Sequence, residues 1–327
     1  MKTNIRILIA LLSASLLLSG CSRKGDQVQL KELRVRLDWS PWAPHAAFYA
    51  AEEQGYFSEE KLKVKLYVPP DPEATIKFVA SGQDDIGVTY MTDTAFALEK
   101  GFKVVSIGAL VPHPLNCIMT LKKSGIDKPS NLKGKIIGIT GVPSDSAFLD
   151  GVLSRNGVQK GSYKLVNIGF NLAMALKSGN VDAIVGAYWP WEGIKLQQEG
   201  YPVNVIKLQD YGVPDYYELI LVARAEMGEK DPDTLRKFLR ACIRGQEFVF
   251  QNPEKAVEIL HSASPDLPTE FLTASLQVMI PLMQSANGIF RQDDATWEEM
   301  ISFMQKSTLL QKALTPSSIF TNQFLPK

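Results

Sequence analysis

The sequence has few of the residues that build metal centres and nucleophilic active sites. Its 327 residues include only three histidines and three cysteines. The histidines lack the H-x-x-x-H spacing of a zinc site, and the motifs G-x-S-x-G, H-E-x-x-H and G-K-[ST] are missing. Cys117 and Cys242 are far apart in sequence, so we expect two buried thiols or one disulfide between them. We therefore expect neither a metal nor a cofactor.

The sequence also lacks an excess of either charge. Lysine plus arginine and aspartate plus glutamate each number 35, which leaves no electrostatic motive for binding nucleic acid. The only marked apolar run at the N-terminus, from Ile7 to Leu18, is shorter than the roughly 20 residues that a membrane-spanning helix requires. These features argue against a nucleic-acid-binding protein and against a spanning N-terminal helix.

The N-terminal residues are instead typical of a secretory signal peptide. Lys2 and Arg6 precede the apolar run, and small residues lead to Cys21. A cysteine at the cleavage point resembles the signal of bacterial lipoproteins, although an uncleaved buried helix is the alternative. We expect residues 1–20 to be removed, Cys21 to carry lipid and residues 21–32 to form a tether. Removing two of the 35 basic residues leaves 33 against 35 acidic ones, a net charge of −2 on 307 residues.

Short apolar strands alternate with amphipathic helices in two stretches of the chain. This βαβαβ order predicts α/β lobes, each with a mostly parallel sheet covered by helices. In the first stretch the expected strands are 33–37, 64–68 and 86–88, with helices at 46–54 and 73–80. In the second they are 136–139, 163–168 and 183–185, with helices at 145–155 and 172–177.

A six-residue echo links the two stretches. Residues 81–86 read Ser-Gly-Gln-Asp-Asp-Ile, and residues 178–183 read Ser-Gly-Asn-Val-Asp-Ala. Each glycine is placed to end a helix, and each aspartate to open a strand. The echo predicts two similar lobes. The remaining chain, from about Asp231, reads as helices at 235–250, 253–260, 269–283 and 297–306, which we expect to pack on the first lobe.

Candidate site residues follow the predicted strands, because ligands bind beyond the carboxyl ends of strands in open α/β sheets. Four of the five tryptophans lie there, namely Trp39, Trp42, Trp189 and Trp191. Packing within their own lobe is the alternative for some of them. The other strand-end candidates are Asp38, His45, Tyr90, Tyr188 and Glu192.

Aromatic faces beside carboxylates suit a planar ligand that carries N–H donors. We expect Trp39, Tyr188 and Trp189 to stack on the ligand, while Asp38 and Glu192 orient it with His45. The strand-end segments contain no arginine or lysine, which a sulfonate, nitrate or phosphate site would be expected to use. His45 could act as a general base, but a hydrogen-bonding histidine at a helix start is favoured.

Several motifs are similar to those of the solute-binding lipoproteins of bacterial ABC importers. They are Asp38-Trp39-x5-His45, Gly55-Tyr56-Phe57, Ser81-Gly82-x2-Asp85-Ile86-Gly87 and the segment from Tyr211 to Leu219. The resemblance points to the branch that captures thiamine pyrimidine precursors such as formylaminopyrimidine. That branch belongs to a family that also includes the thiamine pyrimidine synthases.

The resemblance implies a two-lobed fold of the periplasmic-binding-protein type (type II), with two crossings near Pro112–Cys117 and Tyr211–Leu219. Lobe I would comprise residues 33–113 and 218–327, and lobe II residues 114–217. A heterocyclic solute would lie between the lobes, with Tyr216 and Glu218 also lining the cleft. The protein would be an extracytoplasmic, lipid-anchored monomer that serves a permease and its ATPase.

Two departures from the family bear on this reading. The family often has asparagine or a small residue near position 42 and a histidine directly before the glutamate at position 192. This chain has Trp42 and Trp191 there, so the pocket could suit another solute such as riboflavin or a sulfonate. A synthase-like enzyme is the third possibility. The histidine that synthases consume corresponds to Asp93 here, and their cysteine-rich cluster is missing. We therefore expect a binding protein rather than an enzyme.

Overall fold

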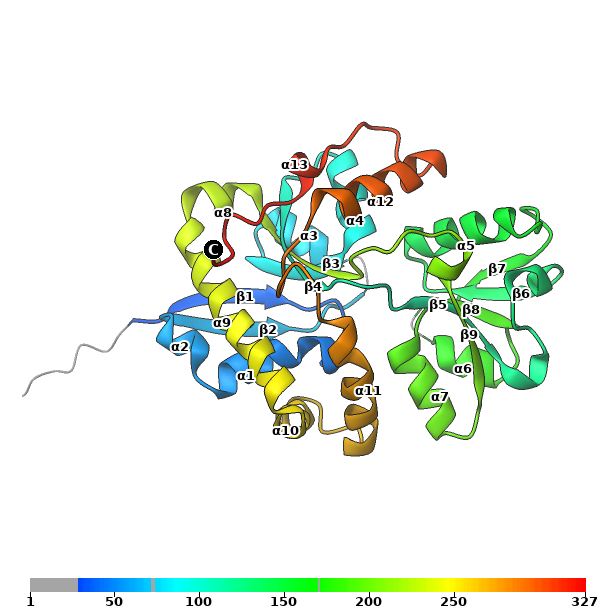
Figure 1. The fold of residues 1–327 in the computed structure, drawn as a ribbon, viewed down its shortest axis with the longest axis horizontal. Helices are drawn as coiled ribbons and strands as arrows, with labels where there is room; N and C mark the ends of the chain where they lie inside the picture. The colour runs from blue at the N-terminus through cyan, green and yellow to red at the C-terminus, as the bar shows by residue number, and fades with distance from the viewer. Residues whose placement is uncertain (1–28, 72–73, 170) are drawn as a thin grey trace, which may run out of the picture.

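The computed structural model describes residues 29–71, 74–169 and 171–327. The predicted signal peptide, Cys21 and most of the tether lie outside these residues. The described chain forms two α/β lobes that lie side by side along the long axis, each built on one five-stranded sheet (Figure 1). Within the described ranges, no helix combines the length and apolar character needed to cross a membrane.

The sheet of the first lobe is mixed. β1, β2 and β3 are parallel, whereas β10 runs antiparallel to both of its neighbours, β3 and β4. The strand order is β2-β1-β3-β10-β4. In that order the strands span Leu62–Tyr67, Lys31–Arg36, Ile86–Tyr90, Leu219–Arg224 and Val104–Val111.

The sheet of the second lobe repeats this topology, with the order β7-β6-β8-β5-β9. β5 is antiparallel to both β8 and β9, and β6 is parallel to β7 and β8. In each lobe the reversed strand is the one through which the chain has just entered from the other lobe. The prediction of mostly parallel sheets is therefore confirmed, with one reversed strand in each. In sheet order the strands span Lys164–Asn167, Ile136–Ile139, Ala183–Tyr188, Asn116–Leu121 and Val203–Lys207.

The chain passes between the lobes twice, through residues 112–115 after β4 and residues 208–218 after β9. Both passages fall at the predicted crossings. The sheet strands consequently lie at 31–111 and 219–224 in one lobe and at 116–207 in the other. The tether prediction is wrong at its end, because Lys31 and Glu32 pair with Leu62 and Lys63 as the first residues of β1.

The predicted helices are present with small shifts at their ends. The expected start at residue 73 lies outside the described residues. Helices that the sequence analysis did not predict are α2, α4, α7, α8 and α13, spanning Tyr56–Glu59, Met91–Glu99, Ile194–Gln198, Ala225–Lys230 and Pro316–Ile319. The predicted ones are α1, α3, α5, α6, α9, α10, α11 and α12, spanning Ala46–Glu53, Ala74–Ser81, Pro143–Arg155, Leu172–Lys177, Pro232–Gln251, Pro253–Ala263, Thr269–Leu282 and Asp294–Lys306.

The C-terminal helices pack mainly on the first lobe, as predicted. α9 contacts α1 and α2, α10 contacts α1, and α13 contacts β4. α11 also contacts α7 and the short helix η4 (Trp189–Gly193) of the second lobe. α11 therefore reaches across from one lobe to the other.

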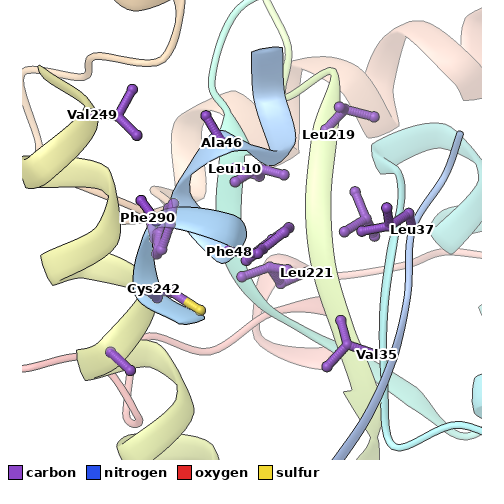
Figure 2. Packing of buried hydrophobic residues seen from close by; sticks show 14 of the residues in the cluster. Val35, Leu37, Ala46, Phe48, Leu110, Leu219, Leu221, Cys242, Val249 and Phe290 are labelled. Atoms are coloured by element: carbon purple, nitrogen blue, oxygen red, sulfur yellow. The ribbon is translucent and has the colours of Figure 1, made fainter. Parts of the chain in front are cut away.

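One hydrophobic layer of the first lobe lies between its sheet and the α1–α9 pair, and a second one lies between the sheet and helices α3 and α4. Figure 2 shows Phe48 of α1 and Cys242 of α9 facing Leu221 of β10 and Val35 of β1. All four side chains are fully buried. Cys117 and Cys242 are both free thiols, each in a different hydrophobic cluster, so the expectation of two buried thiols is the one that the structure confirms.

The two segments of the sequence echo form the same hydrogen-bonding arrangement in both lobes. Asp85 Oδ2 accepts the backbone N–H of Arg34 in β1 at 2.9 Å, and the Asp85 N–H donates to the Arg34 carbonyl at 2.9 Å. Asp182 makes the same pair of bonds with Ile136 of β6, both at 2.8 Å. Each aspartate thus joins the third strand of its lobe to the first.

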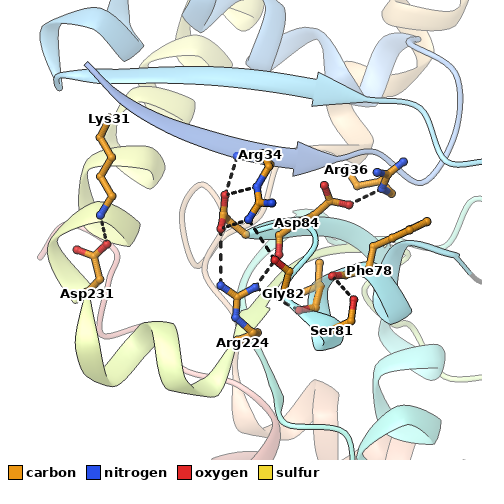
Figure 3. Close-up of polar contacts among 11 residues, drawn as sticks. Lys31, Arg34, Arg36, Phe78, Ser81, Gly82, Asp84, Arg224 and Asp231 are labelled. Carbon is orange, nitrogen blue, oxygen red and sulfur yellow. Dashed lines mark hydrogen bonds and ion pairs between the residues drawn. The ribbon is translucent and has the colours of Figure 1, made fainter. Parts of the chain in front are cut away.

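In the first lobe, two arginine side chains add charged hydrogen bonds to this arrangement. Arg34 Nη2 donates to Asp85 Oδ1 at 3.1 Å and also to the Gly82 carbonyl at 3.1 Å, and Arg224 Nη1 donates to the Asp84 carbonyl at 2.7 Å (Figure 3). Burial raises the pKa of Asp85, but its bonds to Arg34 outweigh this effect and lower the pKa overall. These contacts hold the helix end against the base of the sheet, away from the interlobe cleft.

The contact between α1 and α9 depends on a glycine. A Cβ on Gly245 would lie 2.1 Å from the carbonyl oxygen of Ala47, so the two helix backbones touch at this point. We predict that Gly245→Ala lowers the free energy of unfolding by about 1–3 kcal/mol, because overpacking outweighs the gain in helix propensity. Urea denaturation is the test, with Glu247→Ala on the exposed face of α9 as the control. An equal or higher stability for Gly245→Ala would contradict this close packing.

Candidate functional site

A cleft between the lobes collects the residues that follow the strands. It holds about 630 Å³ of atom-free space, part of which is open to solvent. The first lobe contributes Asp38, Trp39, Trp42, Tyr90 and Thr92, and the second crossing contributes Glu218. The second lobe contributes Asn116, Thr140, Val142, Ser144, Asp145, Phe148, Gly186, Tyr188, Trp191 and Glu192. Six of the nine residues predicted to bind the solute line this cleft.

Asp38 follows β1 and is held by His45. The Nε2 atom of His45 lies 2.7 Å from Asp38 Oδ1, and Nδ1 accepts the backbone N–H of Trp42 at 3.3 Å. Because Nδ1 accepts this N–H, the N–H group at Nε2 is the one that donates to Asp38. His45 does not line the cleft, which differs from its predicted role. It ends the short helix η1 (Ala43–His45) and orients Asp38 from behind.

Glu218 lies on the second crossing and binds the first. Its Oε2 atom accepts the backbone N–H groups of Leu115 at 2.7 Å and Asn116 at 3.0 Å. Oε2 also accepts from the Tyr216 hydroxyl at 3.0 Å, and Oε1 from the Tyr188 hydroxyl at 3.1 Å. Burial raises the pKa of Glu218 to about 7, although these hydrogen bonds oppose the shift.

Tyr216 was predicted to line the cleft, but it is not among the residues that do so. Its ring packs against Phe148, with the ring centroids 5.2 Å apart, while its hydroxyl points to Glu218. Tyr216 therefore supports the carboxylate from the hydrophobic core rather than facing the solute.

Glu192 is a half-buried carboxylate in the second lobe. It lies in η4, directly after β8, and its Oε2 atom accepts the backbone N–H of Tyr188 at 2.8 Å. Burial raises its pKa to about 7, and the backbone hydrogen bonds only partly offset this. A donor on a bound solute would therefore stabilise the charged form of Glu192.

Asp145 is a further carboxylate of the cleft that the sequence analysis did not select. Its Oδ2 atom accepts the backbone N–H of Thr140 at 3.0 Å, and Oδ1 accepts from the Asn116 amide at 3.4 Å. Burial raises its pKa. Gly186 makes room for it, since a Cβ there would lie 2.5 Å from Oδ2. Its place at the start of α5, just after β6, was the available sequence signal.

An aromatic cluster joins the lobes at the cleft. The ring of Trp42 stacks on Tyr188 with centroids 6.0 Å apart and meets Trp191 edge-on at 5.3 Å. Trp191 in turn meets Phe271 of α11 edge-on at 4.9 Å. Ser275 of α11 donates to the carbonyl of Pro190 at 3.0 Å. The two lobes are thus in direct contact over one side of the cleft.

Trp189 does not line the cleft, so its predicted stacking role is wrong. Its ring packs with the core of the second lobe, under the Lys207 ammonium at 4.6 Å. The reason lies in the turn after β8. η4 is a single π-helical turn, and it directs Trp191, two residues later, toward the first lobe.

The cleft carries one sign of charge. Its lining includes the carboxylates of Asp38, Asp145, Glu192 and Glu218, and no lysine, arginine or histidine is among the described residues that line it. An anion would be repelled by this arrangement, whereas N–H donors and cations are favoured. Asp93 lies on α4 beside the cleft and not in its lining.

Comparisons with known proteins agree with this architecture. The formylaminopyrimidine-binding protein of Halalkalibacterium halodurans is 33% identical over 322 residues, covering 96% of this chain and 98% of that protein. The 4-amino-5-hydroxymethyl-2-methylpyrimidine phosphate synthase of Legionella pneumophila is 27% identical, covering 89% and 91%.

The solved structures share the fold at lower identity. The periplasmic aliphatic sulphonate binding protein of Escherichia coli superimposes with a TM-score of 0.70 at 17% identity, covering 90% of this chain and 99% of that one. The family model described as NMT1/THI5 like matches residues 42–256. This match includes every residue that lines the cleft except Asp38 and Trp39, and with it the chain belongs to the NMT1/THI5-like family.

Proposed function

We propose that this protein is the solute-binding lipoprotein of an ABC importer and captures a formylaminopyrimidine-like heterocycle between its lobes. The observation that carries the proposal is the set of four carboxylates in an aromatic cleft whose described lining includes no cationic side chain. An aminopyrimidine offers N–H donors to the carboxylates and a flat face to Tyr188 and Trp39. The relative that binds formylaminopyrimidine supports this assignment.

A sulfonate-binding function is disfavoured by the same cleft. The sulfonate-binding protein shares the fold, but at 17% identity it says nothing about the solute. An anion would have to enter beside Asp38, Asp145, Glu192 and Glu218 with no cation in the described lining. The desolvation and repulsion would oppose binding.

We further propose that the solute is released unchanged. The synthase relatives are more distant than the binding protein, and Asp93 stands where the resemblance places their consumed histidine. The thiols of Cys117 and Cys242 are buried, and burial raises both pKa values well above the ordinary range. Neither thiol is therefore a ready nucleophile.

The location and partners form the remaining part of the proposal. Lipid on Cys21 would hold the protein outside the cytoplasm as a monomer. Its first lobe would comprise residues 31–113 and 218–327, because β1 begins at Lys31, and its second lobe residues 114–217. Closure of the lobes around the solute would present a defined surface to a permease, and an ATPase would drive release. The sulphonate-binding protein that shares this fold is periplasmic, which supports an extracytoplasmic location.

Replacing Glu192 tests the assignment of the solute site. Glu192→Gln removes the charged acceptor but keeps the side-chain shape, and we predict a ten- to hundredfold loss of affinity for formylaminopyrimidine, equivalent to about 1.5–3 kcal/mol. Titration calorimetry is the measurement. Glu199→Gln, at an exposed carboxylate of the neighbouring helix end, is the control. Equal affinity for Glu192→Gln and the wild type would remove Glu192 from the site.

The raised pKa of Glu192 also predicts how the stability of the fold depends on pH. The pKa of Glu192 is raised to about 7 in the folded state, so the folded protein binds more protons than the unfolded chain above pH 4.5, and stability falls as the pH rises through 7. We expect a loss of up to about 3 kcal/mol from this group between pH 5 and 8. In Glu192→Gln the loss, followed by urea denaturation without solute, should be smaller. The same slope in both proteins would show that Glu192 is not desolvated in solution.

The lipid anchor has its own test. Cys21→Ser should release the protein from membranes, because a hydroxyl cannot accept the thioether-linked glyceride. Fractionation of expressing cells, with a wash at high salt, separates anchored from adsorbed protein. Retention of Cys21→Ser in the washed membranes would overturn the lipoprotein assignment.

A further inference from the structure

Two polar atoms of the cleft have no hydrogen-bond partner among the described residues. They are the carboxylate oxygen Oδ2 of Asp38 and the indole nitrogen Nε1 of Trp42. Both residues line the cleft, and each is only 1% exposed. Because buried polar atoms are normally hydrogen-bonded, one acceptor and one donor left open in the same wall indicate a ligand that supplies both partners.

Local contacts hold both atoms in place. The backbone N–H of Trp42 binds His45 Nδ1, and His45 Nε2 binds Asp38 Oδ1, which leaves Oδ2 as the open oxygen. The indole ring is held between Tyr188 and Trp191. A donor and an acceptor fixed in this way lose little freedom when a ligand binds.

We propose that Trp42 determines specificity, donating its indole N–H to an acceptor on the solute while Asp38 Oδ2 accepts an N–H. The solute class is a planar heterocycle that turns both a donor and an acceptor toward residues 38–45. This inference rests on the proposed function. Formylaminopyrimidine meets the requirement in two ways, through the amino group and ring nitrogen of the pyrimidine or through the formamide.

Trp42→Phe is the test, because it keeps an aromatic ring and removes only the N–H. Trp189→Phe is a matched control, since Nε1 of Trp189 is also buried without a partner but its ring lies outside the cleft lining. Calorimetry uses formylaminopyrimidine and its deformylated amine. We expect about tenfold weaker binding for Trp42→Phe and a change of less than about twofold for Trp189→Phe.

The two compounds distinguish the acceptor. A loss confined to formylaminopyrimidine assigns the formyl oxygen to Trp42, and a loss with both compounds assigns a ring nitrogen. Unchanged affinity of Trp42→Phe for both, with wild-type binding intact, overturns this inference alone. An equal loss in Trp189→Phe also overturns it, because the effect would then be general loosening. Failure of the wild type to bind either compound overturns the proposed function.

A second measurement does not depend on the folding of a variant. In ¹⁵N-labelled wild-type protein, the indole N–H resonance of Trp42 should move downfield when formylaminopyrimidine binds, while that of Trp189 stays in place. An indole resonance of Trp42 that does not move on saturation would contradict the proposed hydrogen bond.

Discussion

The two chain crossings meet at one carboxylate, and the arrangement of the cleft depends on it. Glu218 lies on the crossing that leads into β10. It accepts the backbone N–H groups of Leu115, which ends the other crossing, and of Asn116, which begins β5. β10 and β5 are the two reversed strands of the sheets. The Tyr188 hydroxyl ties the same carboxylate to the end of β8 in the second lobe. Glu218 thus fixes the relation between the strand ends that carry the site.

The cost of this arrangement is a buried charge. Desolvation raises the pKa of Glu218 and Glu192 to about 7, even though each accepts hydrogen bonds. Asp38 and Asp145 add two more carboxylates within the same cleft. Such a set is stable only when donors surround it. The protein supplies donors to both oxygens of Glu218 and of Asp145, whereas Asp38 Oδ2 has no partner among the described residues. A solute rich in N–H groups would supply the missing donors.

The repeated features of the fold could be predicted from the sequence. Strand β6 and helix α6 have the predicted bounds, and the two aspartates of the echo make the same pair of backbone hydrogen bonds in each lobe. β4, β5, β9 and β10 were not predicted. In β4, β5 and β10 nearly all residues are buried, so the apolar–polar alternation is lost. For the site, strand-end position identified Asp38, Tyr90, Tyr188 and Glu192. It could not distinguish Trp189 from Trp191, since the π-helical turn after β8 decides which ring faces the cleft.

The most direct test of the account is native mass spectrometry of the full chain purified from the organism that encodes it. We predict one non-covalent solute per chain, released on denaturation with the mass and fragmentation of an aminopyrimidine, and unchanged after prolonged incubation with the protein. A sulfonate or another anion in the cleft would contradict the electrostatic argument, and conversion of the solute to a new product would contradict the binding function.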